Sequence, residues 1–290
     1  MKPESQQLPA GLYLVATPIG AARDITLRAL DILARADVLT AEDTRTIRRL
    51  MDIHGITLNE RPLIAYHDHN GPRRRPQILA HLAAGRSVAY VSEAGTPLVA
   101  DPGYTLVRAA IEAGHGVHAA PGASAVLAAL TVSGLPSDRF MFAGFPPPAA
   151  GARGKFLAGL ADVGATLILY ESPKRIHKTL ADLVQYFGES RKAALCRELT
   201  KRFEETMRGT LGELRQTIGE RKLKGEIAIV VEGAAKETAS EDEMTDALRA
   251  ALERHSLKDA VAEVSARLGL PRRIVYRKAL EMAGTGDENA

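Results

Sequence analysis

Short apolar runs, each closed by a polar or glycine-rich cluster, recur along most of the chain. Their length and composition predict β-strands, and the stretches between them have the periodicity of helices. The runs span residues 12–16, 38–41, 63–66, 87–91, 117–120, 166–170 and 193–196. Strands that alternate with helices favour an α/β fold with a mainly parallel sheet, whose loops after the strands emerge on one side. We therefore expect the polar clusters to converge.

Residues 91–103 are the most informative segment, because a strand end, a glycine turn and a helix start follow one another there. Gly95 allows the backbone to approach a ligand without a Cβ in the way. Asp101 and Pro102 predict an N-cap and a first helical residue, and Gly114 predicts the end of that helix. Such an arrangement builds small-molecule sites at the carboxyl ends of strands. The alternative interpretation is a structural turn without a ligand.

Further helices and strands are predicted on either side of this segment. The pattern over residues 24–35 predicts a helix with Asp24 as its cap. One face of that helix carries Leu27, Leu30, Leu33 and Ala34. Residues 125–133 predict a helix of small side chains, whereas residues 203–209 and 227–231 predict strands that need not be parallel to the others.

The order of these elements predicts two α/β lobes and a helical module. The lobes cover residues 1–121 and 122–235, and the module covers residues 241–290. The Pro/Gly/Ala-rich residues 146–151 predict a rigid loop at the edge of a lobe.

Three short helices are predicted in the module, over residues 244–252, 257–268 and 272–282. The elbow at residues 269–271 is similar to that of a helix-turn-helix. The final helix carries Arg272, Arg273, Arg277 and Lys278. Two interpretations stay open: the module contacts nucleic acid, or it only packs and its basic helix lies in solvent.

Size and composition exclude several classes of protein. A chain of 290 residues is long enough for two domains, and 46% hydrophobic with 25% charged residues is an ordinary globular balance. No apolar run reaches the roughly 18 residues of a membrane span, and the N-terminus lacks the apolar segment of a secretory signal. The single cysteine, Cys196, excludes an internal disulfide, and its place in a strand predicts a buried hydrophobe. We expect a cytoplasmic protein that does not bind membranes.

The net charge of +3 is unevenly distributed. From residue 240 onward the chain has 10 acidic and 8 basic side chains, a net charge of −2, which leaves +5 for residues 1–239. The positive excess is clustered at Arg45, Arg48 and Arg49, at Arg73, Arg74 and Arg75, at Lys174 and Arg175, and at Lys201 and Arg202. Clusters of this kind suit a polyanionic partner, although a solvated surface is the alternative.

Ten motifs, in order along the chain, resemble those of the ribosomal RNA small-subunit methyltransferase I family. They are residues 14–20, 24–30, 42–45, 66–70, 94–97, 101–103, 121–125, 133–136, 170–173 and 197–201. The resemblance implies the tetrapyrrole-methylase fold, with S-adenosylmethionine in a cleft between two lobes and usually a homodimer. It further implies 2′-O-methylation of a cytidine ribose in the decoding region of 16S rRNA, the RNA of the small ribosomal subunit.

The chain departs from the family pattern at a few positions. Glu93 stands where the family usually has Asp, and Lys174 replaces His. An Asn-Leu pair is replaced by residues 21–22, and Pro146 replaces Leu. Because Glu93 is one methylene longer than Asp, any contact expected from the family's Asp is in doubt.

With this resemblance, the cofactor is expected to lie against backbone donors and acceptors of the glycine turn and of the helix start at residue 124. The expected cofactor-binding residues are Pro18, Gly95, Thr96, Pro97, Ser124, Ala125, Phe142 and Ala143, the last two on the adenine side. The chain lacks the G-x-G-x-x-G pattern of dinucleotide-binding domains, which argues against NAD.

The acceptor side needs a group that helps to deprotonate a weakly acidic ribose hydroxyl, and cations that hold phosphates. The expected catalytic residues are Glu42, Asp43 and Glu171, and the expected RNA-binding residues are Arg23, Arg45, Lys174, Arg175 and Lys201. An alternative for residues 42–45 is a helix cap in which Asp43 or Thr44 caps and Arg45 pairs with a neighbour. Arg197 and Glu198 are likewise open to interpretation as a structural ion pair.

His67, Asp68 and His69 raise the question of a metal site. Residues i and i+2 of an extended segment share a face but do not supply a full ligand set, so a loop at the cleft mouth is favoured and no metal is expected.

Two competing functions remain alongside RNA methylation. A tetrapyrrole methyltransferase would share the fold, but the basic clusters and the helical module argue against a small substrate. A non-catalytic RNA- or ribosome-binding protein would have no use for the glycine turn at Gly95 and the helix start at Ser124.

Overall fold

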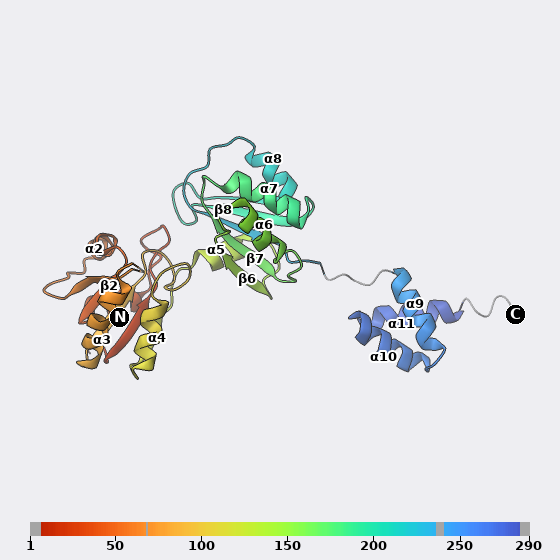
Figure 1. The fold of residues 1–290 in the computed structure, drawn as a ribbon, viewed down its shortest axis with the longest axis horizontal. Coiled ribbons are helices and arrows are strands. Elements are labelled where there is room, and N and C mark those ends of the chain that lie inside the picture. The colour runs from red at the N-terminus through yellow and green to blue at the C-terminus, as the bar shows by residue number, and fades with distance from the viewer. Residues whose placement is uncertain (1–6, 68, 236–240, 285–290) are drawn as a thin grey trace. The chain divides into compact units, whose positions relative to one another are not determined.

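The computed structural model describes residues 7–67, 69–235 and 241–284. It divides the chain into two compact units, with the boundary between Glu232 and Gly233. Within these described residues, the first unit holds two five-stranded sheets with their helices, and the second holds three helices (Figure 1). The strands of the two sheets lie within residues 11–120 and 140–231. The lobe boundaries predicted at residues 121 and 235 stay predictions.

The first sheet is entirely parallel and has the strand order β3-β2-β4-β1-β5. Its strands are β1 (Gly11–Val15), β2 (Val38–Ala41), β3 (Leu63–Ala65), β4 (Ser87–Val91) and β5 (Val117–Ala120), and its helices are α1 (Leu27–Arg35), α2 (Thr44–Ile53), α3 (Gly71–Ala83) and α4 (Tyr104–Glu112).

Alternate residues of β4 bury opposite faces of this sheet, as the pleat requires. Ala89 and Val91 pack in the core with α1 and α2, whereas Val88 and Tyr90 pack in the core with α3 and α4. The parallel sheet covered by helices on both faces confirms the predicted α/β class.

The second sheet is mixed and has the strand order β6-β7-β10-β8-β9. Its strands are β6 (Phe140–Gly144), β7 (Thr166–Glu171), β8 (Lys192–Arg197), β9 (Glu205–Thr210) and β10 (Ile227–Val231), and its helices are α5 (Ala125–Ser133), α6 (Ala150–Ala158), α7 (Ile176–Phe187) and α8 (Leu211–Ile218). β6 and β7 are parallel, while β10 runs antiparallel to β7 and β8, and β8 runs antiparallel to β9. The expectation of a mainly parallel sheet is therefore wrong here. The prediction that the strands over residues 203–209 and 227–231 need not be parallel to the others is confirmed.

Two cores again cover the two faces of the second sheet. Ile227, Ile229 and Val231 of β10 pack with α6, α7 and α8, and Ala228 and Val230 pack with α5. The α5 helix therefore covers one face of the second sheet, and its first residues follow directly from β5 of the first sheet (Figure 1).

The predicted cap and face of α1 are wrong. Thr26, not Asp24, is the N-cap, and its hydroxyl accepts a hydrogen bond from the Ala29 N–H. Because the helix begins at Leu27, its buried face is formed by Ala29, Ile32 and Leu33. The side chain of Leu27 lies in the first turn and is 76% exposed.

The predicted start of α4 is also wrong. Neither Asp101 caps this helix nor Pro102 opens it, because the chain turns through Gly103 (φ 122°), which is the N-cap. A Cβ at Gly103 would lie 2.9 Å from the ring of Tyr90, so only glycine fits this turn. The helix end predicted at Gly114 (φ 77°) is confirmed.

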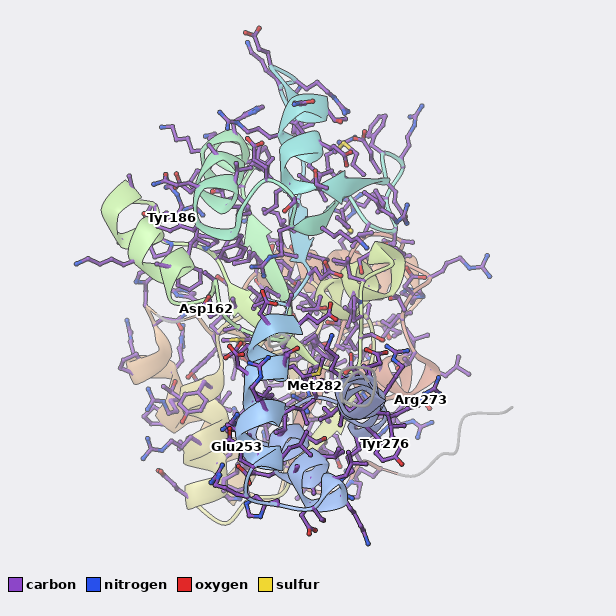
Figure 2. The ribbon with its side chains drawn as sticks, turned by 90° about the vertical axis from the view of Figure 1, so that its right-hand side faces the viewer. Asp162, Tyr186, Glu253, Arg273, Tyr276 and Met282 are labelled. Carbon is purple, nitrogen blue, oxygen red and sulfur yellow. The ribbon has the colours of Figure 1, made fainter. Side chains whose placement is uncertain are left out.

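The second unit is a three-helix module made of α9 (Glu241–Leu252), α10 (Leu257–Leu268) and α11 (Arg272–Gly284). Its helices share one core that includes Leu248, Val264 and Val275. The bounds of α10 are as predicted, and the helix ends at Gly269 in the left-handed conformation. Arg273 and Tyr276 of α11 are exposed, and Figure 2 labels both on this helix.

Three smaller expectations concern loops and ligands. The α6 helix begins at Ala150, inside the segment 146–151 that was expected to be a loop. Asp68 lies outside the described residues, and the rings of His67 and His69 are 6.0 Å apart. Within the described part of the chain there is neither a group of three potential metal ligands nor a helix long and apolar enough to cross a membrane.

Candidate functional site

A cavity of about 500 Å³ lies where the strand ends of both sheets come together in the first unit. Its first-sheet side is formed by loops that follow β1, β2, β4 and β5, and its second-sheet side by loops that follow β6, β7 and β8. The predicted convergence of polar clusters is confirmed for these loops. The described residues that line the cavity are Ile19, Glu42, Glu93, Ala94, Gly95, Thr96, Val99, Ala100, Asp101, Ser124, Ala125, Phe145, Tyr170, Glu171, Ser172, Pro173, Cys196, Leu199, Gly225, Glu226, Ile227 and Ala228.

The glycine turn after β4 is fixed to the loop after β1. The N–H and C=O groups of Gly95 and Thr17 exchange two hydrogen bonds of 3.0 Å. Gly95 has a φ of 81°, and a Cβ there would lie 3.2 Å from Ile19, another cavity residue. The Thr96 hydroxyl donates to the Ala123 carbonyl at 3.0 Å, which joins the turn to the start of α5. The backbone of this turn is therefore held against the cavity.

Asp101 is the most unusual carboxyl group of the cavity. Its Oδ2 atom is buried and has no hydrogen-bond partner among the described residues. Burial, together with the nearby charges of Glu42 and Glu93, raises the pKa of Asp101 to about 6, although hydrogen bonds with Ser92 and with the Leu98 backbone act in the opposite direction. Burial and the charge of Glu42 also raise the pKa of Glu93. The first-sheet side of the cavity thus carries three carboxyl groups, one of which titrates near neutral pH.

Asp43 and Arg45, both predicted as site residues, form the cap of α2 instead of lining the cavity. Asp43 accepts a hydrogen bond from the backbone N–H of Arg45 at 2.8 Å. It also forms an ion pair with the Arg45 guanidinium at 2.7 Å. The side-chain hydrogen bond from Arg45 lowers the pKa of Asp43 to about 2. This is the capping alternative that the sequence left open.

Glu171 lines the cavity, but its carboxylate is engaged on both oxygens. One oxygen accepts the Ser172 N–H and pairs with the Arg175 guanidinium, both at 2.7 Å. The other accepts the hydroxyl of Thr179 on α7. Arg175 also donates to the Pro146 carbonyl at 3.1 Å. These contacts make Glu171 and Arg175 the anchor of the loops after β6 and β7.

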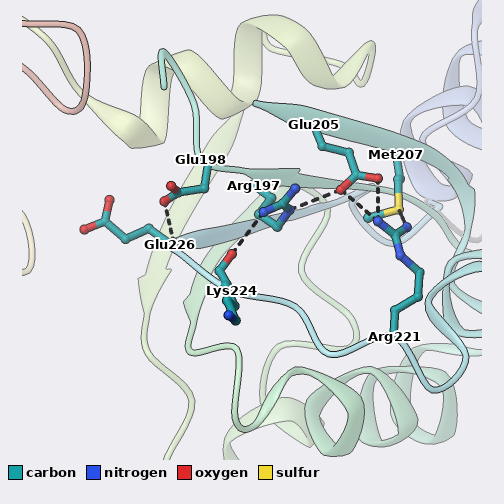
Figure 3. A network of polar contacts seen from close by, with 7 residues as sticks. All are labelled: Arg197, Glu198, Glu205, Met207, Arg221, Lys224 and Glu226. Carbon is teal, nitrogen blue, oxygen red and sulfur yellow. Dashed lines mark hydrogen bonds and ion pairs between the residues drawn. The ribbon is translucent and has the colours of Figure 1, made fainter. Parts of the chain in front are cut away.

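Lys201 and its neighbours belong to a polar network at the edge of the second sheet. The Lys201 ammonium pairs with Glu198 at 3.0 Å and with Glu226 at 2.9 Å. Figure 3 shows the adjoining contacts, in which the Glu226 N–H donates to Glu198 and Arg197 pairs with Glu205. Arg197 and Glu198 are therefore both paired, but with other residues rather than with each other.

Phe142 and Ala143 do not reach the cavity, which corrects the prediction that they line it. The ring of Phe142 packs edge-on against Tyr170 in the core beneath α5, and Ala143 packs in the core on the other face. The pleat of β6 directs these two side chains into the two cores. The aromatic residues that do line the cavity are Tyr170 and Phe145, of which Phe145 lies just beyond β6.

The other predicted site residues divide into two groups. Glu42, Gly95, Thr96, Ser124 and Ala125 line the cavity as expected. Pro18, Pro97, Arg23 and Lys174 lie outside its lining, and the last two are exposed.

Several cavity residues were not expected from the sequence. Asp101 was assigned to a helix cap, and Cys196 only to the core, where it is indeed buried and burial raises its pKa to about 11. Tyr170 lies near the carboxyl end of β7, so the expectation that residues at strand ends line the site would have predicted it correctly. Residues 225–228 could not be predicted as site residues in this way, because they lie at the beginning of β10 rather than at its end.

The two sheets are joined closely beside this cavity. The Ala21 N–H donates to the Thr200 hydroxyl at 3.1 Å. A Cβ on Gly20 would lie 2.5 Å from Lys201 Cγ, 2.6 Å from Thr200 Oγ1 and 3.0 Å from the Leu199 carbonyl oxygen. The loops after β1 and β8 therefore touch through the bare backbone of a glycine.

Comparison with protein families gives two matches that together cover most of the chain. Residues 11–215 match the model of the Tetrapyrrole (Corrin/Porphyrin) Methylases. Residues 238–283 match the model described as the RsmI C-terminal HTH domain.

Individual proteins are similar over nearly the whole chain. A protein of Mesorhizobium japonicum named Ribosomal RNA small subunit methyltransferase I is 47% identical, over 98% of this chain and 96% of its own length. A protein of Xylella fastidiosa with the same name is 45% identical, over 92% of this chain and 98% of its own. Among solved structures, uroporphyrin-III C-methyl transferase from Thermus thermophilus, complexed with S-adenyl homocysteine, has a TM-score of 0.53 at 20% identity. It covers 77% of this chain and 97% of its own, and it shares the fold.

Adding a single methyl group at Gly20 should destabilise the first unit. We expect Gly20→Ala to lower the free energy of unfolding by about 1–3 kcal/mol, because the new Cβ overpacks the contact with residues 199–201. Urea unfolding measures this change, and amide exchange at Ala21 should accelerate. Gly151→Ala is the matched control, because a Cβ there meets nothing within 4 Å. Equal effects of the two substitutions would show that the Gly20 contact does not hold the sheets together.

Proposed function

Because the chain belongs to the ribosomal RNA small subunit methyltransferase I family, within the tetrapyrrole methylases, we propose that it methylates a cytidine ribose of 16S rRNA. The acceptor is the 2′-hydroxyl group, and the target lies in the decoding region of the small ribosomal subunit. The observation that carries the proposal is 47% identity over 98% of the chain to a relative of that name. The chain is a methyltransferase, as its sequence predicts, and S-adenosylmethionine is its methyl donor.

The cavity fits this donor in size and in chemistry. About 500 Å³ is within the usual range of cofactor pockets. The backbone of Gly95 and Thr96 and the start of α5 at Ser124 and Ala125 would hold the donor, since helix N-termini suit a carboxylate. When bound, S-adenosylmethionine supplies a methyl group on a positively charged sulfur. The carboxyl groups on the first-sheet side complement that positive charge.

Asp101 is the group best suited to accept the proton of the ribose hydroxyl. It lines the cavity, its Oδ2 receives no hydrogen bond from the residues that the structure describes, and its raised pKa of about 6 makes it a better base than an ordinary carboxylate. Asp43 is held ionised by Arg45, and both oxygens of Glu171 accept hydrogen bonds already. After Asp101, Glu42 is the second candidate for the base. It is one of the expected catalytic residues, and it lines the same side of the cavity as Asp101.

The expected RNA-binding residues take different parts in this proposal. Arg23 and Lys174 are exposed cations of the cavity loops and are suited to phosphates; Arg45 is also exposed, although its guanidinium pairs with Asp43. Arg175 and Lys201 are engaged in the ion pairs described above, so their first role is to hold loops. We place the protein in the cytoplasm, where its substrate is found, and as a homodimer.

The second unit adds a surface for RNA. α11 exposes Arg272, Arg273 and Arg277 together with Tyr276, which is 46% exposed. Lys278 is instead paired with Glu241 at 2.5 Å. Three exposed guanidinium groups beside an aromatic ring suit a phosphate backbone. We therefore favour nucleic-acid contact over a purely packing role for this module.

The proposed reaction is tested by incubating the protein with methyl-labelled S-adenosylmethionine and small ribosomal subunits that lack the modification. We expect label in 16S rRNA, resistant to alkaline cleavage at one cytidine, because a 2′-O-methyl group blocks that cleavage. Uroporphyrinogen serves as the competing acceptor. Label only in the tetrapyrrole would establish the alternative substrate class, and RNA binding without any label would establish a non-catalytic binder.

Replacing Asp101 should remove a pH dependence. The wild-type rate should fall about tenfold per pH unit below about pH 6, where the carboxyl group is protonated, and level off above it. We expect Asp101→Asn to lower kcat by about 10²–10⁴-fold and to abolish this dependence. The affinity for S-adenosylhomocysteine should change little.

Asp101→Asn should lower kcat but should not lower the stability of the fold. Since the folded state raises the pKa of Asp101 from about 4, the wild type loses stability as the pH rises from about 4 to about 6. Asp101→Asn should therefore unfold at the same or a higher temperature than the wild type at pH 7.5. Asp162→Asn, an exposed residue labelled in Figure 2, is the control for both measurements. An unchanged kcat in Asp101→Asn would rule out this base.

Neutralising the basic face of α11 should weaken RNA binding only. We expect the triple change of Arg272, Arg273 and Arg277 to Gln to raise the KM for small subunits about tenfold and to flatten its salt dependence. The triple change of Arg249, Arg254 and Arg267, also exposed in the second unit, is the matched control. Identical KM values for the two triple variants would assign the module a packing role.

A further inference from the structure

Phe145 is a large aromatic side chain at the cavity, and its position is unusual. It lines the cavity immediately after β6, yet 53% of its surface is exposed. The chain is poor in aromatic residues, which make up 4% of it, with no Trp. What distinguishes Phe145 from other exposed aromatic residues such as Phe140 and Phe203 is that it lines the cavity, where its ring is available to a ligand.

The turn of the backbone that places this ring comes from a bulge in β6. The register between β6 and β7 shifts between Phe142 and Gly144, and Gly144 has a φ of 74°. A bulge adds a residue to one strand and redirects the side chains that follow it. Phe142 therefore points into the core, while Phe145 reaches the cavity.

A second aromatic ring supports Phe145 from the protein side. Its ring lies edge-on to Tyr170, with centroids 5.5 Å apart and an interplanar angle of 63°. Tyr170 contacts Phe142 in the same manner at 4.8 Å. Burial raises the pKa of Tyr170 to about 12, and a hydrogen bond from the Val126 N–H at the start of α5 opposes this shift. The support beneath Phe145 is thus part of the core.

The loop that follows is held at both ends by arginine side chains. Arg175, paired with the buried Glu171, donates to the Pro146 carbonyl at 3.1 Å. Arg153, which is buried and pairs with Asp182 at 2.6 Å, donates to the Pro148 carbonyl at 3.0 Å. Three consecutive prolines at 146–148 restrict the backbone between these anchors. The backbone that follows Phe145 is therefore held in place, and the ring itself rests against Tyr170.

We propose that Phe145 is the platform on which the base of the target nucleotide stacks, a proposal that rests on the proposed RNA substrate. A ribose hydroxyl reaches a cavity only when its nucleotide leaves the surrounding base stack, and the base then needs a new partner. Aromatic side chains supply that partner in single-stranded RNA recognition, because every base has a π-face. A fixed, half-exposed ring offers one face at no cost in ordering. The donor's adenine is the competing occupant, and the test separates the two.

The test compares Phe145→Ala with the wild type in two binding measurements. We expect the affinity for a fluorescently labelled single-stranded RNA of the target sequence to fall between about five- and 150-fold, since a base gains this much by stacking. The affinity for S-adenosylhomocysteine, measured by calorimetry, should stay within twofold. Phe145→Tyr should bind both ligands like the wild type, because it keeps the ring.

Phe140→Ala is the matched control, because Phe140 is 43% exposed at the opposite end of the same strand. It should leave both affinities unchanged, and thermal unfolding should show that both alanine variants fold. Loss of S-adenosylhomocysteine affinity in Phe145→Ala would place the ring against the donor and overturn the proposal. Unchanged RNA affinity would overturn it as well. Failure of the wild type to methylate rRNA would refute the proposed function separately, since the RNA-binding comparison needs no methyl transfer.

Discussion

The close backbone contact between the loops after β1 and β8 is the constraint on which the site depends. At Gly20 no side chain intervenes, and the Ala21 N–H reaches the Thr200 hydroxyl at 3.1 Å. On the first-sheet side, the paired hydrogen bonds of Thr17 and Gly95 fix the glycine turn to the same loop. One short segment, residues 17–21, therefore sets the distance between the carboxyl groups after β4 and the second sheet, and with it the width of the cavity.

Much of this architecture can be predicted from the sequence, because strand ends in parallel sheets meet on one side. That rule places Glu42, Gly95 and Ser124 on one side of the first sheet, and it places Glu171 at a strand end of the second sheet; all four line the cavity. It fails for Gly225–Ala228, since β10 is antiparallel to its neighbours and contributes its beginning rather than its end. Direction of pairing is decided by long-range contacts, which the local pattern of apolar residues does not record.

The errors at Asp101 and at Phe142 have physical causes of the same kind. Asp-Pro before an apolar run has the local signature of a helix cap, but the helix begins only after Gly103, where the ring of Tyr90 leaves no room for a Cβ and its hydroxyl donates to the Pro102 carbonyl. Phe142, in the middle of β6, was expected to line the cavity, whereas a bulge between Phe142 and Gly144 lies before Phe145, which lines it instead. In both cases a single contact between distant segments overrides a sound local rule.

Strain and unpaired charge are concentrated around the cavity. Leu98 and Ala100, in the loop before Asp101, have φ values of 70° and 55°, and Glu198 and Thr200, across the cavity, have φ values of 51° and 63°. Such conformations cost free energy in residues other than glycine and persist only where surrounding contacts enforce them. Asp101 adds a buried carboxyl oxygen that has no hydrogen-bond partner in the described part of the chain. A fold selected for stability alone would relax these features, so their presence on both sides of one cavity is itself an argument that binding and catalysis occur there.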